Sequence, residues 1–185
     1  MKDLNEKKIS SINIYKGTLL NVKKDIVLLP NGKKGTREWV KHPGAVCCIP
    51  ILPNGEIGLI RQFRYPVKKE MIEIPAGKLD KNEKPENGVI RELEEEIGFK
   101  AKKITFLTTI YPAIGFSNEK MWIYLAEDLF KTKVKLDADE FLELIPTPLK
   151  EAINMIWLGK ITDVKTIIGL LWVERLFKIK TDTIK

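Results

Sequence analysis

The sequence has few of the residues that build sulfur or histidine sites. Its 185 residues include two cysteines, Cys47 and Cys48, and one histidine, His42. A single histidine excludes a histidine-rich metal site and a histidine triad. Adjacent residues of a strand point to opposite faces, so we expect no disulfide between the two cysteines. Both are expected to be small apolar residues of a reduced, cytoplasmic protein.

Long apolar runs are also missing. No stretch approaches the roughly 20 apolar residues that span a bilayer, and the N-terminal MKDLNEKKISS lacks the apolar segment of a signal peptide. We therefore expect no membrane contact and a cytoplasmic location. Hydrophobic residues make up 44% of the chain, which is enough for one sizeable core.

Acidic residues are fewer than basic ones, and the formal net charge is +7. Lysines spread along the chain supply most of the positive charge, and the five arginines are Arg37, Arg61, Arg64, Arg91 and Arg175. A positive field suits a polyphosphate substrate as well as it suits RNA, so charge alone does not choose between these partners.

Strand patterns dominate the sequence outside its central and C-terminal helical segments. Short apolar runs and the turn signals at 30–32 and 53–55 predict strands. They are expected at 12–20, 25–29, 36–41, 45–52, 56–63, 71–74, 104–110, 119–125 and 141–145. Two helices are expected near the end of the sequence, at 149–158 after a Thr147-Pro148 cap and at about 163–179 after an Asp163 cap.

Residues 77–99, GKLDKNEKPENGVIRELEEEIGF, concentrate carboxylates on one more predicted helix. Pro85 suits its first turn and Gly98 the position just past its end. At about 100° per residue, its apolar face comprises Val89, Ile90, Leu93 and Ile97, and another face carries Glu92, Glu95 and Glu96. Arg91 lies one turn before Glu95, and Glu94 is expected to point into solvent.

Like charges at this spacing repel by roughly a few tenths of a kcal/mol per pair. A bound Mg²⁺ or Mn²⁺ would turn this repulsion into a favourable interaction, because hard divalent cations prefer oxygen ligands. Arg91 would hold one carboxylate by a bidentate hydrogen bond. For RELEEE alone, an ordinary solvated helix face is the alternative interpretation. The spacing of Gly77 and Glu83 ahead of it favours the cation site.

The whole pattern resembles the box of the Nudix hydrolases: Gly77, Glu83, and then Arg91-Glu92-Leu93-x-Glu95-Glu96-x-Gly98. The resemblance implies an α/β fold, an α/β/α sandwich with a mixed β-sheet, at 43–185. Residues 1–42 are expected to form a small β-appendage that provides dimer contacts and contacts to the substrate's adenine. Trp39 is expected to lie in the core or at the dimer interface.

The same resemblance assigns roles within the box. Glu92 and Glu96 would be the chief metal ligands, assisted by Glu95 and by the backbone carbonyl of Ala76. Glu83 would anchor the helix through Arg91 or through a bound water. Two or three Mg²⁺ (or Mn²⁺) ions are implied.

Segments flanking the box resemble the ADP-ribose pyrophosphatases of this family. They are 37–46, 61–66, 73–77 and 111–119, with Ile114 a departure because many relatives carry proline there. The implied reaction is hydrolysis of ADP-ribose to AMP and ribose 5-phosphate. The alternatives are another nucleoside diphosphate substrate, such as GDP-mannose, and a nucleotide- or RNA-binding module. The complete set of carboxylates argues against a pure binding module.

Residues outside the box would choose the substrate and activate water. Arg64, and after it Arg61, suit a diphosphate because guanidinium grips phosphate bidentately, although a surface ion pair is the alternative for Arg61. By resemblance, Arg37 and Glu38 would contact adenine, and Glu119 would approach the metals or substrate. The general base is placed by resemblance in the acidic segment 136–143. Glu140 is preferred there, Asp139 and Glu143 are alternatives, and a solvated loop is the other interpretation.

Overall fold

The computed structural model describes residues 2–136 and 140–183, and these form two compact units. The N-terminal unit comprises residues 2–44 and 111–120, and the core unit comprises 45–110, 121–136 and 140–183. Asp139, an alternative for the general base, lies outside the described residues. The sequence did not predict that 111–120 would belong with the N-terminal strands.

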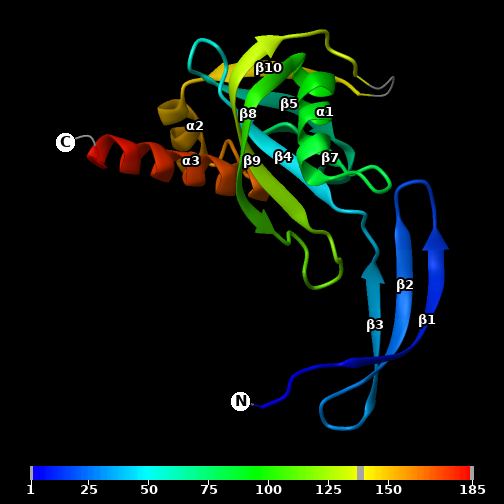
Figure 1. Cartoon of the computed structure of the whole chain (residues 1–185). Helices are drawn as coiled ribbons and strands as arrows, with labels where there is room; N and C mark the ends of the chain where they lie inside the picture. Colours follow the sequence, from blue (N-terminus) through cyan, green and yellow to red (C-terminus); the bar gives the residue numbers. More distant parts are fainter. Residues whose placement is uncertain (1, 137–139, 184–185) are drawn as a thin grey trace. The chain divides into compact units, whose positions relative to one another are not determined.

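Two sheets form the centre of the core unit (Figure 1). The larger sheet is mixed, because β4 runs parallel to β9 and antiparallel to β7. Its order is β7 (Ala76–Lys78), β4 (Ala45–Pro50), β9 (Met121–Lys131) and β8 (Phe99–Ile110). The smaller, antiparallel sheet has the order β10 (Leu142–Thr147), β5 (Ile57–Arg64) and β6 (Lys69–Glu73), and a short 3-10 turn, η1 (Tyr65–Val67), joins its last two strands.

Strand β4 is buried on both faces and separates two apolar clusters. Val46 and Cys48 belong to the cluster that contains Leu93 of α1 (Pro85–Ile97). Cys47 belongs to the cluster of α2 (Leu149–Trp157) and α3 (Val164–Thr183). This layering confirms the α/β/α prediction. Both cysteines are free and buried, as expected.

The box helix begins and ends where the sequence predicts. Pro85 is its first residue, and Gly98 ends it with a φ of +68°, a left-handed conformation that favours glycine. Val89, Leu93 and Ile97 are buried beneath it, which confirms the predicted apolar face. The loop before the helix and its polar face are thereby fixed against β4 and β7.

Several boundaries differ from the predictions. One strand was expected over 12–20, but β1 (Lys7–Lys16) ends early and a turn leads into β2 (Asn21–Leu28). Gly17 closes this turn by donating from its N–H to the Leu20 carbonyl at 2.8 Å. The short strand β7 was not predicted at all. The Thr147 cap is also wrong, because its hydroxyl donates to the carbonyl of Ile145 and Pro148 takes the cap position.

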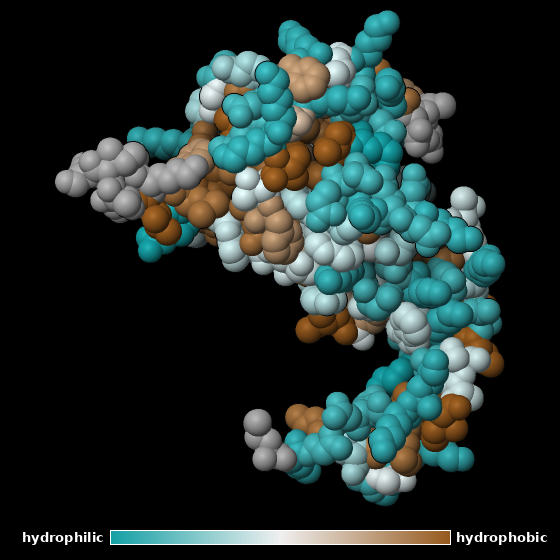
Figure 2. Space-filling view, in the orientation of Figure 1, coloured by the Kyte–Doolittle hydropathy of each residue, from teal (hydrophilic) through white to brown (hydrophobic). Residues whose placement is uncertain are grey.

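The N-terminal unit is an antiparallel sheet of β1, β2 and β3 (Lys34–Val40), completed by the segment 111–120. That segment joins β3 where the Val40 N–H donates to the Phe116 carbonyl at 2.7 Å. Every residue of β1 is exposed. The surface of this unit carries apolar side chains among hydrophilic ones (Figure 2).

The helices formed by the described residues are all too short or too polar to cross a membrane.

Candidate functional site

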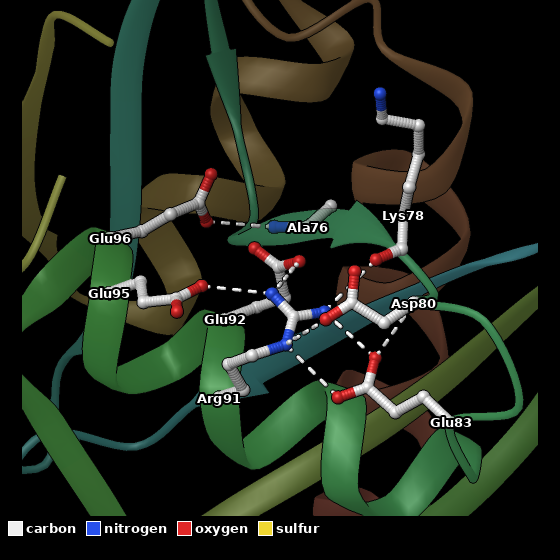
Figure 3. Close-up of polar contacts among 8 residues, drawn as sticks. All are labelled: Ala76, Lys78, Asp80, Glu83, Arg91, Glu92, Glu95 and Glu96. Atoms are coloured by element: carbon white, nitrogen blue, oxygen red, sulfur yellow. Dashed lines mark hydrogen bonds and ion pairs between the residues drawn. The ribbon is translucent and has the colours of Figure 1, made fainter. Parts of the chain in front are cut away.

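Arg91 lies at the centre of the polar face of α1 and donates hydrogen bonds to three carboxylates (Figure 3). Its Nη1 donates to Glu92 at 2.7 Å and to Glu95 at 2.8 Å. Its Nε and Nη2 form a bidentate pair with Glu83 at 3.0 and 2.9 Å. The sequence indicated one bidentate partner and the neighbour Glu95. The structure brings Glu92 into the same group.

The loop before the helix is bound to the same guanidinium. Arg91 Nη2 donates to the Lys78 carbonyl at 3.0 Å, and the Glu83 carboxylate accepts the N–H of Asp80 at 3.0 Å. The hydrogen bond from Arg91 holds the pKa of Glu83 below its usual value. The expected contact between Glu83 and Arg91 is therefore present, and it fastens the loop to the helix.

Gly77 leaves room for the carboxylate of Glu92. A Cβ at position 77 would lie 2.0 Å from the Cδ and Oε1 atoms of Glu92, so any other residue there would displace this carboxylate. Burial raises the pKa of Glu92 to about 6, assisted by Glu95 and Glu140 and opposed by Arg91. The ionised form of Glu92 is thus destabilised by burial even with a guanidinium beside it.

Glu96 is the most deeply buried carboxylate of the helix, at 5% exposure. It accepts the N–H of Ala76 at 2.9 Å, which joins the helix to β7 (Figure 3). Burial, followed by the charge of Glu92, raises the pKa of Glu96 to about 8. A buried anion with this environment is stabilised by a nearby cation.

The remaining glutamates of the region have distinct environments. Glu140 is exposed, and its charge is felt by both Glu92 and Glu96, which indicates that it lies near them. Glu94 was expected to be solvated, and that is wrong. Its side chain is 17% exposed and pairs with Lys100 at 3.1 Å and Lys135 at 3.3 Å, because the strand after the helix brings lysine back to it.

Two of the predicted phosphate-binding arginines already have carboxylate partners. Arg61 pairs with Glu143 and Glu70, which is the ion pair given above as its alternative role. Arg64 donates two hydrogen bonds of 2.8 Å to the buried carboxylate of Glu73. Arg64 also interacts electrostatically with Glu96, so its positive charge acts on the carboxylates of α1.

The expected adenine contacts lie in the N-terminal unit. On β3, Arg37 Nε donates to Glu6 at 2.9 Å, and Glu38 lies 3.7 Å from the ammonium of Lys24. Glu119 belongs to the segment 111–120, with one of its oxygens 3.9 Å from Nε2 of His42. The roles proposed for these residues stay predictions.

The oxygen atoms of the box match the preference of Mg²⁺ and Mn²⁺, and Glu96 has the environment of a carboxylate that needs a cation. Among the residues described, however, no three acidic, histidine or cysteine side chains converge as a metal site. Arg91 binds both Glu92 and Glu95 in this structure. A metal ion would compete with Arg91 for them.

Sequence reasoning missed two residues of α3. Lys165 and Thr166 are buried and bind the segment that precedes β7, at Glu73 and at Ile74. The only signal near them was the expected helix cap Asp163, which does accept the N–H of Thr166 at 3.0 Å. Nothing in the spacing of the chain indicates that this helix start meets residues 73 and 74.

The raised pKa of Glu96 predicts how stability changes with pH in a chelator. Between the ordinary pKa of 4.5 and about 8, Glu96 is protonated in the folded protein and ionised in the unfolded one. Folding then takes up a proton, so the free energy of unfolding falls as pH rises, by about 2–4 kcal/mol from pH 5 to pH 8. Urea unfolding in EDTA measures the free energy of unfolding at each pH. In Glu96→Gln this free energy should fall less between pH 5 and pH 8 than in the wild type. An equal fall in the two proteins would refute the raised pKa of Glu96.

Comparison with known proteins places this site in a family. The NUDIX domain model matches residues 41–165, and a nucleoside diphosphate sugar hydrolase N-terminal domain matches residues 6–40. An ADP-ribose pyrophosphatase of Bacillus subtilis (strain 168) is 41% identical over 94% of this chain and 95% of its own. A methanol dehydrogenase activator of Bacillus methanolicus is 39% identical over 91% of this chain and 92% of its own.

A solved structure agrees with the fold. A crystal structure of an ADP compounds hydrolase has a TM-score of 0.86, with 23% identity, and the match covers 97% of this chain and 98% of that one. The carboxylates around Arg91 lie on the loop and helix that the matched domain includes. The chain belongs to the Nudix hydrolase family.

Proposed function

We propose that the protein hydrolyses ADP-ribose to AMP and ribose 5-phosphate with the help of bound divalent metal ions. The observation that carries this proposal is the likeness, over nearly the whole chain, to a protein named ADP-ribose pyrophosphatase. The cluster of Glu92, Glu95 and Glu96 on the polar face of α1 supports this proposal, because a diphosphate needs cations and these carboxylates can hold them.

The metal ions are Mg²⁺, or Mn²⁺ in its place, and two or three of them bind. Their ligands are Glu92, Glu95, Glu96 and the carbonyl of Ala76. Support comes from the oxygen-only donor set and from the raised pKa values of Glu92 and Glu96. When bound, such ions neutralise phosphate charge and lower the pKa of water. The hydrogen bonds between Arg91 and Glu83 hold the helix and its preceding loop together.

The remaining residues of the core unit bind the diphosphate and move a proton. Arg64 takes a phosphate oxygen, and Arg61 assists. Water attacks one phosphorus atom as Glu140 accepts its proton, and the bridging P–O bond breaks to release two monophosphates. Glu140 is favoured over Glu143, since its charge acts on both Glu92 and Glu96. Arg37 and Glu38 bind adenine, and Glu119 approaches the metals or the substrate.

A nucleotide sugar such as GDP-mannose is the second candidate substrate. It is supported by the match of residues 6–40 to a nucleoside diphosphate sugar hydrolase N-terminal domain. Relatives of nearly equal identity also have different names, so overall similarity does not choose the substrate. A cytoplasmic location, expected from the sequence, stays a prediction.

Glu96→Gln tests the metal-dependent reaction. We expect kcat for ADP-ribose in Mg²⁺ to fall by about a thousandfold while the protein stays folded, because a buried anionic ligand is lost. The matched control is Glu94→Gln on the same helix, whose partners are Lys100 and Lys135, and its kcat should stay unchanged. Product formation by chromatography and far-UV circular dichroism measure the two properties. Full activity in Glu96→Gln would overturn the metal assignment.

A substrate panel tests the proposal against its alternatives. Purified protein is incubated with Mg²⁺ and ADP-ribose, nucleotide sugars, dinucleotides or capped RNA, and the products are identified. ADP-ribose should have the highest kcat/KM. Faster cleavage of GDP-mannose would favour the second substrate, and tight RNA binding without any hydrolysis would favour a binding module.

The general base is tested by comparing two residues of the same acidic segment. Glu140→Gln should lower kcat by about a hundredfold or more, with KM changed little, because it removes the proton acceptor. Glu143→Gln should leave kcat within about threefold and affect mainly KM, through its partner Arg61. The opposite ranking of the two kcat values would assign the base to Glu143.

We also propose that the protein is a homodimer assembled through the N-terminal sheet. Ile9, Ile12 and Ile14 of β1 are 51%, 58% and 55% exposed, an apolar surface that a second copy would cover. Trp39 is less available for that interface, since its indole N–H donates to Asp25 at 3.0 Å within the sheet. Light scattering should give twice the chain mass of 21.2 kDa. Ile12→Asp should shift it toward the monomer, and a monomeric wild type at micromolar concentration would refute the proposal.

A further inference from the structure

Lys165, in the first turn of α3, is a buried lysine at 6% exposure. Lysine is almost never fully buried unless its charge is paired. Its ammonium binds the carboxylate of Glu73 and lies 3.0 Å from that of Asp163. The proposed chemistry leaves this lysine without a role.

Glu73 connects Lys165 to a predicted phosphate-binding residue. Its carboxylate, buried at 3% exposure, accepts two hydrogen bonds of 2.8 Å from Arg64 in addition to the one from Lys165. Burial acts to raise the pKa of Glu73, but Arg64 and Lys165 outweigh it and hold that pKa below its usual value. Two cations therefore share one buried anion.

Among the residues described, Arg64 is bound along one edge of its guanidinium. Its Nε and Nη2 atoms are bound to Glu73, and no described residue accepts a hydrogen bond from Nη1. The guanidinium side chain is 42% exposed and interacts electrostatically with Glu96. This arrangement leaves one edge of Arg64 available to an anion close to the carboxylates of α1.

The first turn of α3 also fixes the chain that follows Glu73. The hydroxyl of Thr166 accepts the N–H of Ile74 at 2.9 Å and donates to Asp163 at 2.5 Å. Two residues further on, the N–H of Ala76 donates to Glu96. Lys165 and Thr166 thus hold the segment 73–76, which binds Arg64 at one end and Glu96 at the other.

We propose that Lys165 is a positioning residue for diphosphate binding: it shares the charge of Glu73 and so keeps Arg64 oriented, with Nη1 available to a phosphate. This inference rests on the proposed diphosphate substrate. Without Lys165, the buried Glu73 would have Arg64 as its only strong cation. The group of Arg64, Glu73, Asp163 and Lys165 would also change from neutral to a net charge of −1, which repels a phosphate.

Lys165→Met tests the proposal, because methionine keeps an apolar stem and removes the charge. We expect KM for ADP-ribose to rise about tenfold and kcat to stay within about threefold. The Kd of ADP, measured by calorimetry, should rise by the same factor. The matched control is Lys178→Met, an exposed lysine of the same helix that pairs with Glu174, and it should change neither value.

A second variant separates charge sharing from simple loss of packing. In Lys165→Met/Glu73→Gln the net charge of the group returns to that of the wild type, and glutamine still accepts a hydrogen bond from Arg64. We expect KM to return to within about threefold of the wild type. If Lys165→Met does not fold, as judged by circular dichroism, Lys165→Gln, which also removes the charge, takes its place. The same rise in KM and in the Kd of ADP is expected, and unchanged values would overturn the proposal.

The outcomes distinguish this inference from the proposed function. An unchanged KM and Kd in Lys165→Met would overturn it, and so would a loss of kcat and melting temperature with KM unchanged. A double variant as weak as the single one would overturn it as well. If the wild type does not hydrolyse ADP-ribose, the proposed function fails, while the Kd of ADP still decides the role of Lys165. No ADP binding by the wild type would overturn the inference.

Discussion

The structure of the site depends on one interaction, the binding of several carboxylates by the guanidinium of Arg91. Without it, Glu83, Glu92 and Glu95 would repel one another across one loop and one helix. Arg91 turns this repulsion into a set of charge-assisted hydrogen bonds and adds the Lys78 carbonyl to it. The loop cannot move away from the helix without breaking several of these bonds at once, so the backbone beside the carboxylates is held in place.

Packing brings the remaining pieces to this point. Leu93 and its apolar neighbours hold α1 against β4, and the antiparallel pairing of β7 with β4 sets the height of Ala76 and Gly77 beside the helix. Glycine at position 77 then admits the Glu92 carboxylate, and the Ala76 N–H reaches Glu96. The apolar face of the helix and its charged face are therefore two parts of one arrangement, because displacing Leu93 would also displace the carboxylates.

The sequence predicts most of this where the determinants are local. Helical periodicity places Glu92, Glu95 and Glu96 on one face, and Pro85 and Gly98 mark the helix ends. Prediction from the sequence fails where the partner of a charged residue comes from another element of the fold. Glu94 looked solvated because Lys100 and Lys135 return to it only after the next strand has folded. The bond between Lys165 and Glu73 joins positions 92 residues apart, and no spacing rule connects a helix start to a strand end at that distance.

Charge balance shows where a divalent cation is most needed. Glu83 and Glu95 are satisfied by Arg91, Glu94 by two lysines, and Glu73 by Arg64 and Lys165. Glu92 is only partly satisfied, and Glu96, at 5% exposure, has a backbone N–H and the charge of Arg64 to offset its burial. The two carboxylates whose ionised forms are least stabilised are therefore Glu96 and Glu92, one helical turn apart. A cation that binds there gains more than it would anywhere else on the helix, because it relieves the two carboxylates that the protein leaves destabilised.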